Sequence, residues 1–386
     1  MLDERNVHHG KQVLAMNLAL SDEQEFLREA ARGALSRVKT IEAAREALEG
    51  GTLPDLWPTV VEAGWPGLLI DEDHGGAGLS AFDAMLVAQE CGRVLAGAPL
   101  LGLLPASALL QAAGDESLEA VAAGAARPAW LPARPPGDLV AGWTVDARSG
   151  KHRPAAPRAT VDGDRVSFTG EVAWVPDAPG ADLLVVVGVD AGGAPVAGVV
   201  EAGAAQVQAA VRYDATRSLG HVTLDGAAGR RLEVSEAQLA RAWYLAQALL
   251  AAESLGAVET ALEMAVQYAK ERFTFGRAIG SYQAIKHGLT EVLRRQENAR
   301  SLLYYTGWAF DDQPEQFALA ASAARSAAGS ALDFAARQNI VTHGGIGATW
   351  EHDAPLFFRR AQLCRRLLGG AGDATDRVAG ELLAAA

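Results

Sequence analysis

The sequence predicts an α+β fold that is mostly helical, in the order helices, β domain, helices. From Ser21 the apolar residues recur at helical spacing, and this pattern continues with breaks to about Arg127. Short β-like runs separated by glycine and aspartate then follow as far as Leu232. From Ser235 the chain is again helical in pattern and rich in alanine and leucine. A chain of 386 residues is long enough for two or three such domains.

The N-terminal helical domain is expected over residues 16–128. Residues 1–15 show no helical pattern and are expected to form a disordered leader. Ser21 is followed three residues later by Gln24, and this spacing predicts a capping box that begins the first helix. Two further helices are expected on either side of an acidic, glycine-rich loop at 71–78, namely Trp57–Leu69 and Phe82–Val94.

The middle β domain is expected over residues 129–234, because the prolines that follow Arg127 break any helix. The apolar stretch Ala181–Val200 is interrupted by aspartates, glycines and a proline, so it does not predict a membrane span. It predicts two strands joined by a turn. A C-terminal helical domain over 235–386 completes the chain.

Composition and charge exclude several classes of function. The 34 Lys and Arg residues against 47 Asp and Glu residues give a formal net charge of -13, which argues against nucleic acid as a partner. Cys91 and Cys364 are far apart and show no metal-ligand spacing, so they predict reduced thiols and no metal site. The N-terminus has no apolar signal region, and we therefore expect a cytoplasmic protein without membrane segments.

Two glycine-containing stretches are candidates for ligand binding. Residues 271–280 form a compact turn with two arginines and two glycines after a long helix, and Gln283 opens the next helix. This arrangement suits an anionic ligand, although a bare helix turn with surface arginines explains it about as well. In the stretch 343–353 the glycines allow a ligand or another chain to approach the backbone closely, and a simple loop between helices is the alternative.

Together these stretches resemble the acyl-CoA dehydrogenase family of flavoproteins, and the resemblance covers nearly the whole chain. The family's R-x-x-F-G, followed by glutamine, is similar to Arg272, Phe275, Gly276 and Gln283. Its H-G-G-x-G, followed by T-W-E-H, is similar to residues 343–352. The resemblance implies an N-terminal helical domain, a middle β-barrel or sandwich domain and a C-terminal four-helix bundle, assembled as dimers or tetramers.

Family members desaturate an acyl-CoA thioester, and the resemblance therefore implies a carboxylate that removes the α-proton while FAD takes the β-hydride. An electron-transfer flavoprotein usually reoxidises the FAD. The usual glutamate corresponds here to Leu368 or Gly369, and its alternative position on the first C-terminal helix corresponds to Ala246 or Gln247. A side chain that does not titrate cannot replace a general base, so no catalytic base is assigned. Asp373 is the fallback candidate.

Other positions also depart from the family pattern. The family's T-E-P-x-x-G-S-D motif is missing before Thr160, and Pro176 replaces the hydroxyl residue that is expected against the flavin ring. Glu253 on the long apolar helix is a further candidate base, and the favoured interpretation is a buried structural glutamate paired with an arginine. The arginine pairs 359–360 and 365–366 are expected on a solvated face or in salt bridges between subunits.

In this family FAD lies between two subunits, and the sequence retains the set that holds the nucleotide. The resemblance implies that Arg272 binds the diphosphate and that Phe275 and Gln283 contact the adenine side. The full predicted cofactor set is Arg272, Thr274, Phe275, Gln283, Gly344, Gly345 and Gly347. Val341 stands where the family often has another glutamine, and Gln338 lies one helical turn earlier.

The leading hypothesis is therefore a base-lacking subunit that pairs with a catalytic acyl-CoA dehydrogenase subunit, as a heterodimer or an α2β2 heterotetramer. It resembles paired actinobacterial subunits that oxidise bulky acyl-CoA thioesters such as steroid fragments. Two alternatives remain open. One is an active homomeric dehydrogenase with Asp373 as a relocated base, and the other is a flavin-free protein that binds or scaffolds CoA thioesters.

Overall fold

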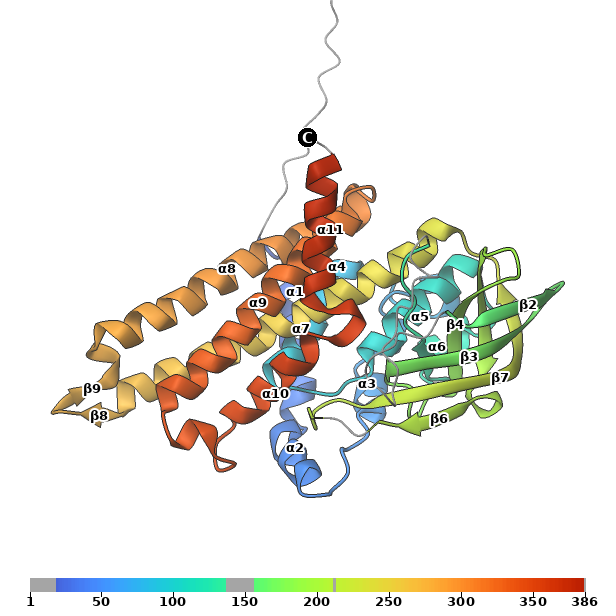
Figure 1. The fold of residues 1–386 in the computed structure, drawn as a ribbon. Helices are drawn as coiled ribbons and strands as arrows, with labels where there is room; N and C mark the ends of the chain where they lie inside the picture. The colour runs from blue at the N-terminus through green and yellow to red at the C-terminus, as the bar shows by residue number, and fades with distance from the viewer. Residues whose placement is uncertain (1–18, 137–155, 211–212, 385–386) are drawn as a thin grey trace, which may run out of the picture.

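The computed structural model describes residues 19–136, 156–210 and 213–384, so the predicted leader at 1–15 lies outside the described residues. Helices come first, strands follow, and helices return (Figure 1). The N-terminal helices are α1 (Asp22–Ser36), α2 (Thr40–Leu48), α3 (Trp57–Glu62), α4 (Ala81–Arg93), α5 (Leu100–Ala113) and α6 (Leu118–Ala122). The C-terminal helices are α7 (Glu236–Glu271), α8 (Gln283–Asp312), α9 (Phe317–His343), α10 (Ala354–Cys364) and α11 (Gly370–Ala384).

Local sequence signals set the ends of the N-terminal helices. The predicted capping box at Ser21 is confirmed, since its hydroxyl accepts from the Gln24 N–H while the Gln24 side chain accepts from the Ser21 N–H. The predicted helix Trp57–Leu69 is wrong in length, because α3 ends at Glu62. Gly64 adopts a φ of 71°, which ends the α-helix before a short 3-10 turn at Trp65–Gly67.

The strands close into a barrel. They are β1 (Pro128–Trp130), β2 (Arg158–Asp162), β3 (Arg165–Pro176), β4 (Leu183–Val189), β5 (Pro195–Glu201), β6 (Gln206–Ala209) and β7 (Leu219–Leu232). The sheet runs β4-β2-β3-β7-β5, and β4 also pairs with β5, which joins the two edges of this ring. The predicted pair of strands within Ala181–Val200 is confirmed as β4 and β5, antiparallel from Leu183 opposite Glu201 to Val189 opposite Pro195.

The C-terminal bundle is organised around α7. Ser235 and Gln238 form another capping box at its start. α7 packs against α4 on the N-terminal side and against α8 and α9 within the bundle, which explains why its apolar residues are not confined to one face. α10 and α11 pack against α9 (Figure 1). Among the described residues, none of the helices is both long enough and apolar enough to cross a bilayer.

A buried ionic cluster joins the three parts of the chain. Arg217, just before β7, forms an ion pair with Glu253 of α7, and both side chains are almost fully buried. The expected pairing of Glu253 with an arginine is therefore confirmed. Arg360 of α10 donates from Nε to Asp214 at 2.9 Å and from NH2 to the Leu95 carbonyl at 3.3 Å. Its predicted place on a solvated face or between subunits is wrong, because Asp214 supplies a buried counter-charge within the same chain.

Candidate functional site

The predicted arginine turn is a short hairpin at the end of the bundle away from the barrel (Figure 1). Its strands are β8 (Phe273–Thr274) and β9 (Arg277–Ala278). The two residues between them, Phe275 and Gly276, have φ values of 52° and 77°, the conformation of a tight two-residue hairpin turn. This turn holds the Phe275 ring 93% exposed to solvent.

The hairpin brings the predicted nucleotide-binding residues to one exposed end. Arg272 follows the last residue of α7, and its carbonyl accepts from the Ile279 N–H at 2.8 Å. Within the described part of the chain its exposed guanidinium has no hydrogen-bond or ion-pair partner. The Thr274 carbonyl accepts from the Tyr282 hydroxyl at 3.1 Å, and the exposed Gln283 begins α8 directly afterwards. These contacts fix the backbone and leave the polar side chains of Arg272 and Gln283 exposed.

The predicted glycine loop follows α9. Gly344 has a φ of 65°, and no atom lies within 4 Å of the place where a Cβ would stand on Gly344 or Gly345. A Cβ on Gly347 would stand 2.7 Å from the His343 Cβ, so only glycine fits there. The His343 ring lies 4.4 Å from the ring of Tyr268 on α7. This contact places the loop against the part of α7 that leads into the hairpin.

The glutamine that the family often carries near this loop has no counterpart that reaches it. Val341 stands at that position and is 65% exposed. Gln338 instead faces α8, where its amide nitrogen lies 2.5 Å from the place of a Cβ on Gly288. The sequence pattern could not predict this direction, because it depends on the packing of two helices about 50 residues apart in the chain.

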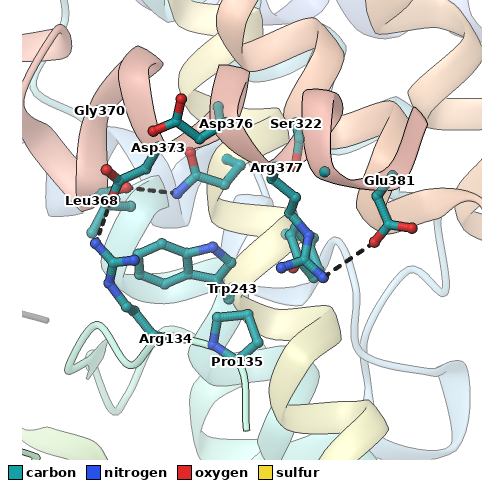
Figure 2. Close-up of a pocket in the computed structure, with 14 residues that line it drawn as sticks. Arg134, Pro135, Trp243, Ser322, Leu368, Gly370, Asp373, Asp376, Arg377 and Glu381 are labelled. Carbon is teal, nitrogen blue, oxygen red and sulfur yellow. Dashed lines mark hydrogen bonds and ion pairs between the residues drawn. The ribbon is translucent and has the colours of Figure 1, made fainter. Parts of the chain in front are cut away.

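The described residues also line a pocket of about 490 Å³ against the N-terminal half of α7 (Figure 2). Both predicted base positions meet here, since Gln247 Nε2 donates to the Leu368 carbonyl at 2.9 Å. Ala246, the other candidate on α7, is fully buried and does not line the pocket. Leu368 adopts a φ of 52°, which is unusual for a residue with a branched side chain. Neither side chain that faces the pocket at these positions can take up a proton.

The carboxylates of the pocket lie on α11, and the fallback base is paired. Asp373 forms an ion pair with Arg134, which comes from the proline-rich segment after β1 (Figure 2). Glu381 lies 3.7 Å from Arg377, and the Trp243 ring lies between the two arginines in this view. The sequence analysis missed Arg134 and Trp243, and only the unusual proline-rich run marked the first of them. Asp373 would have to leave Arg134 before it acted as a base.

Pro176 lies at the end of a barrel strand, among side chains that are buried or packed against one another. Pro176 ends β3 and is buried, while Trp174 has a φ of 58° and packs edge-on against His221 at 4.7 Å. Asp177 directly follows Pro176 and is fully buried. Its carboxylate accepts a hydrogen bond from the Gly102 N–H at 2.9 Å. Burial raises the pKa of Asp177 to about 6. Part of the predicted departure from the family, residues 137–155, lies outside the described residues.

Family profiles match both helical parts of the chain. The profile described as acyl-CoA dehydrogenase, N-terminal domain, matches residues 21–124, and the one described as acyl-CoA dehydrogenase, C-terminal domain, matches residues 240–381. Acyl-CoA dehydrogenase IpdE2 of Mycolicibacterium smegmatis is 30% identical over 368 residues, which covers 94% of this chain and 100% of that protein. The chain belongs to the acyl-CoA dehydrogenase family. Members of this family are FAD-dependent oxidoreductases.

A second relative and two solved structures also match nearly the whole chain. Acyl-CoA dehydrogenase IpdE2 of Mycobacterium tuberculosis is also 30% identical, over 94% of this chain and 98% of that protein. The Tcur3481-Tcur3483 steroid ACAD, solved as a variant, has a TM-score of 0.81 at 26% identity, covering 94% of this chain and 98% of that chain. The ChsE4-ChsE5 complex from Mycobacterium tuberculosis has the same TM-score at 24% identity, covering 95% and 99%, which shows the shared fold alone.

Family members bind FAD, and the residues that the family resemblance assigns to its two ends differ in their chemistry. At the predicted nucleotide end, the exposed Arg272 supplies a positive charge, and Gly344 and Gly345 leave open space beside the backbone, which suits a diphosphate. Pro176, at the position that the resemblance assigns to the flavin ring, has neither a hydroxyl nor a backbone N–H to donate. The described part of the chain also contains no group of three or more metal-type ligands.

Proposed function

We propose that this chain is the base-lacking subunit of a heteromeric acyl-CoA dehydrogenase, and that it lends the adenine and diphosphate half of a shared FAD site. The observation that carries the proposal is the pair Gln247 and Leu368. These residues come from the two alternative base positions, they meet in one pocket, and neither is a carboxylate. A catalytic partner subunit then supplies the base and the flavin end of the site.

Arg272 is the residue to which we assign the diphosphate. Its guanidinium is exposed beside the β8–β9 hairpin, so it can make two parallel hydrogen bonds to phosphate oxygens. Gly344, Gly345 and Gly347 let the loop backbone approach the same ligand closely. When bound, FAD would accept the hydride that leaves the acyl β-carbon. This chain would hold its nucleotide end in place.

The comparisons support a heteromer that acts on a bulky acyl-CoA. One structural neighbour, 26% identical, is named as the Tcur3481-Tcur3483 steroid ACAD. We propose a steroid or related lipid acyl-CoA as the substrate, a heterodimer or an α2β2 heterotetramer as the assembly, and an electron-transfer flavoprotein as the electron acceptor. We further propose that the complex is cytoplasmic and that residues 16–128, 129–234 and 235–386 form the three domains.

Replacement of the diphosphate ligand tests this assignment. Arg272→Ala should strip FAD from the mixed complex, because the half-site loses its charge-assisted hydrogen bonds, while the complex itself still assembles. The matched control is Arg294→Ala on α8, whose guanidinium is also exposed and, among the described residues, pairs only with Glu291 of its own helix. Flavin absorbance per complex and size-exclusion chromatography give the two readouts. Full FAD occupancy in Arg272→Ala would contradict the half-site.

A further inference from the structure

Two histidines lie at the ends of the glycine loop and contact each other. His343 is the last residue of α9 and is only 5% exposed. The centre of its ring lies 4.0 Å from that of His352, which stands just before α10. The loop between them, residues 344–351, carries the three glycines that we assign to the FAD half-site. The contact between the two rings therefore brings the two ends of the loop together.

The hydrogen bond that His352 accepts requires a neutral ring. His352 Nδ1 accepts from the N–H of Ala354 at 3.1 Å, and a ring nitrogen that carries a proton cannot accept. His343 Nδ1 lies 2.8 Å from the Asn339 carbonyl, so this nitrogen donates. Ala354 is the first residue of α10, and the N-cap residue Asp353 makes no side-chain hydrogen bond to the helix. His352 thus provides a side-chain cap for α10.

Charge around His352 favours the same state. Burial and the neighbouring His343 lower the pKa of His352, Arg45 of α2 acts in the same direction, and Asp353 opposes them. Arg45 and Asp353 form an ion pair. A positive charge at this place would also face the positive end of the α10 dipole. Protonation would therefore remove an acceptor and place a cation where its surroundings oppose one.

We propose that neutral His352 is the positioning residue of the glycine loop, and that its protonation releases the loop from α10. The effect on the loop requires no partner subunit and no FAD. The consequence for FAD rests on the proposed function, since it requires that the loop hold the nucleotide. Acidification then lowers the affinity of the mixed complex for FAD through this one side chain.

Hydrogen exchange of residues 344–356 in the chain alone tests the positioning role at pH 7.5 and 5.5, after correction for intrinsic exchange. Between the lowered pKa of His352 in the closed loop and its higher pKa in the open loop, each unit fall in pH should raise loop opening by up to about tenfold, because the open state binds one more proton. His352→Asn keeps an oxygen acceptor but does not titrate, so its protection should not change with pH. His352→Ala should lose protection at both values. His287→Asn, an exposed histidine on α8, should behave like the parent chain.

Equal pH dependence in the parent chain and in His352→Asn would overturn the proposal, as would unchanged protection in His352→Ala. FAD retention by the mixed complex, measured over the same pH range, distinguishes the positioning role of His352 from the role of the loop in FAD binding. If the loop opens as expected and FAD stays bound, the assignment of the glycine loop to the FAD half-site fails while the positioning role stands. If the loop does not open, the positioning role fails whatever FAD does.

Discussion

Glu253 offers a sharp test, because a structural role and a catalytic role predict opposite results for one substitution. It is a carboxylate on the helix where some family members place the base. Its side chain is 2% exposed, it pairs with the fully buried Arg217, and it lies 3.8 Å from Arg360 NH1. Glu253→Gln keeps the size of the side chain and removes its charge. Arg217 then stays buried without its main counter-charge.

The expected cost is large. Breaking a buried ion pair from one side costs about 3–5 kcal/mol, because the remaining charge stays desolvated. At about 2 °C per kcal/mol for a chain of this size, the melting temperature should fall by about 6–10 °C. The control is Glu263→Gln, also on α7, whose side chain is 61% exposed and pairs with Arg93 at 2.9 Å. That pair should be worth no more than about 1 kcal/mol.

Differential scanning calorimetry of both variants gives the stabilities, and turnover per folded mixed complex gives the activity. We expect Glu253→Gln to be strongly destabilised and to retain turnover in the fraction that stays folded. Wild-type stability together with lost turnover would refute the reasoning, because it would make Glu253 a catalytic base. A difference between the two variants of less than about 1 kcal/mol would also refute it, since a buried pair would then cost no more than an exposed one.

Two further substitutions test the packing and the electrostatics. Asp177 binds its proton more tightly in the folded chain, so the free energy of unfolding should fall by up to about 3 kcal/mol as pH rises from about 4 to about 6. Asp177→Asn should remove this fall in pH-dependent urea titrations, and an unchanged profile would contradict it. Gly256→Ala would place a Cβ 1.9 Å from the Gln89 carbonyl of α4 and should destabilise by at least about 2 kcal/mol. Gly33→Ala, on an open face of α1, should be neutral or stabilising by up to about 1 kcal/mol in the same urea assay, and equal effects would contradict the packing account.

Local patterns predicted much of the fold. The capping box at Ser21 and the strand pair within Ala181–Val200 depend on residues close together in the chain, and the structure confirms both. The helix expected over Trp57–Leu69 is shorter, because apolar spacing continues through Gly64 while the backbone turns there. Arg360 is buried for a reason that no local pattern contains, since Asp214 is 146 residues away.

At the candidate site, too, contacts between residues far apart in the chain could not be predicted from the sequence. The resemblance to a family marked Gln247 and Leu368 as alternative positions for one function, and the structure places them in contact. It did not predict the ion pair between Arg134 and Asp373, which are 239 residues apart. Sequence motifs record which residues a ligand requires, whereas such a pair depends on the final packing of the proline-rich segment against α11. The arginine hairpin was predictable because all of its contacts are local.

The most direct test of the shared site is the amount of FAD per chain, measured by absorbance after denaturation. It should be measured for the chain purified alone and for the chain purified together with the proposed catalytic acyl-CoA dehydrogenase subunit. The account predicts no flavin in the chain alone and about one FAD per pair of subunits in the complex. One FAD per chain in the protein alone, with acyl-CoA turnover that Asp373→Asn abolishes, would contradict it in favour of a homomeric enzyme. Absence of flavin from every complex would contradict it in favour of a protein that binds CoA thioesters without FAD.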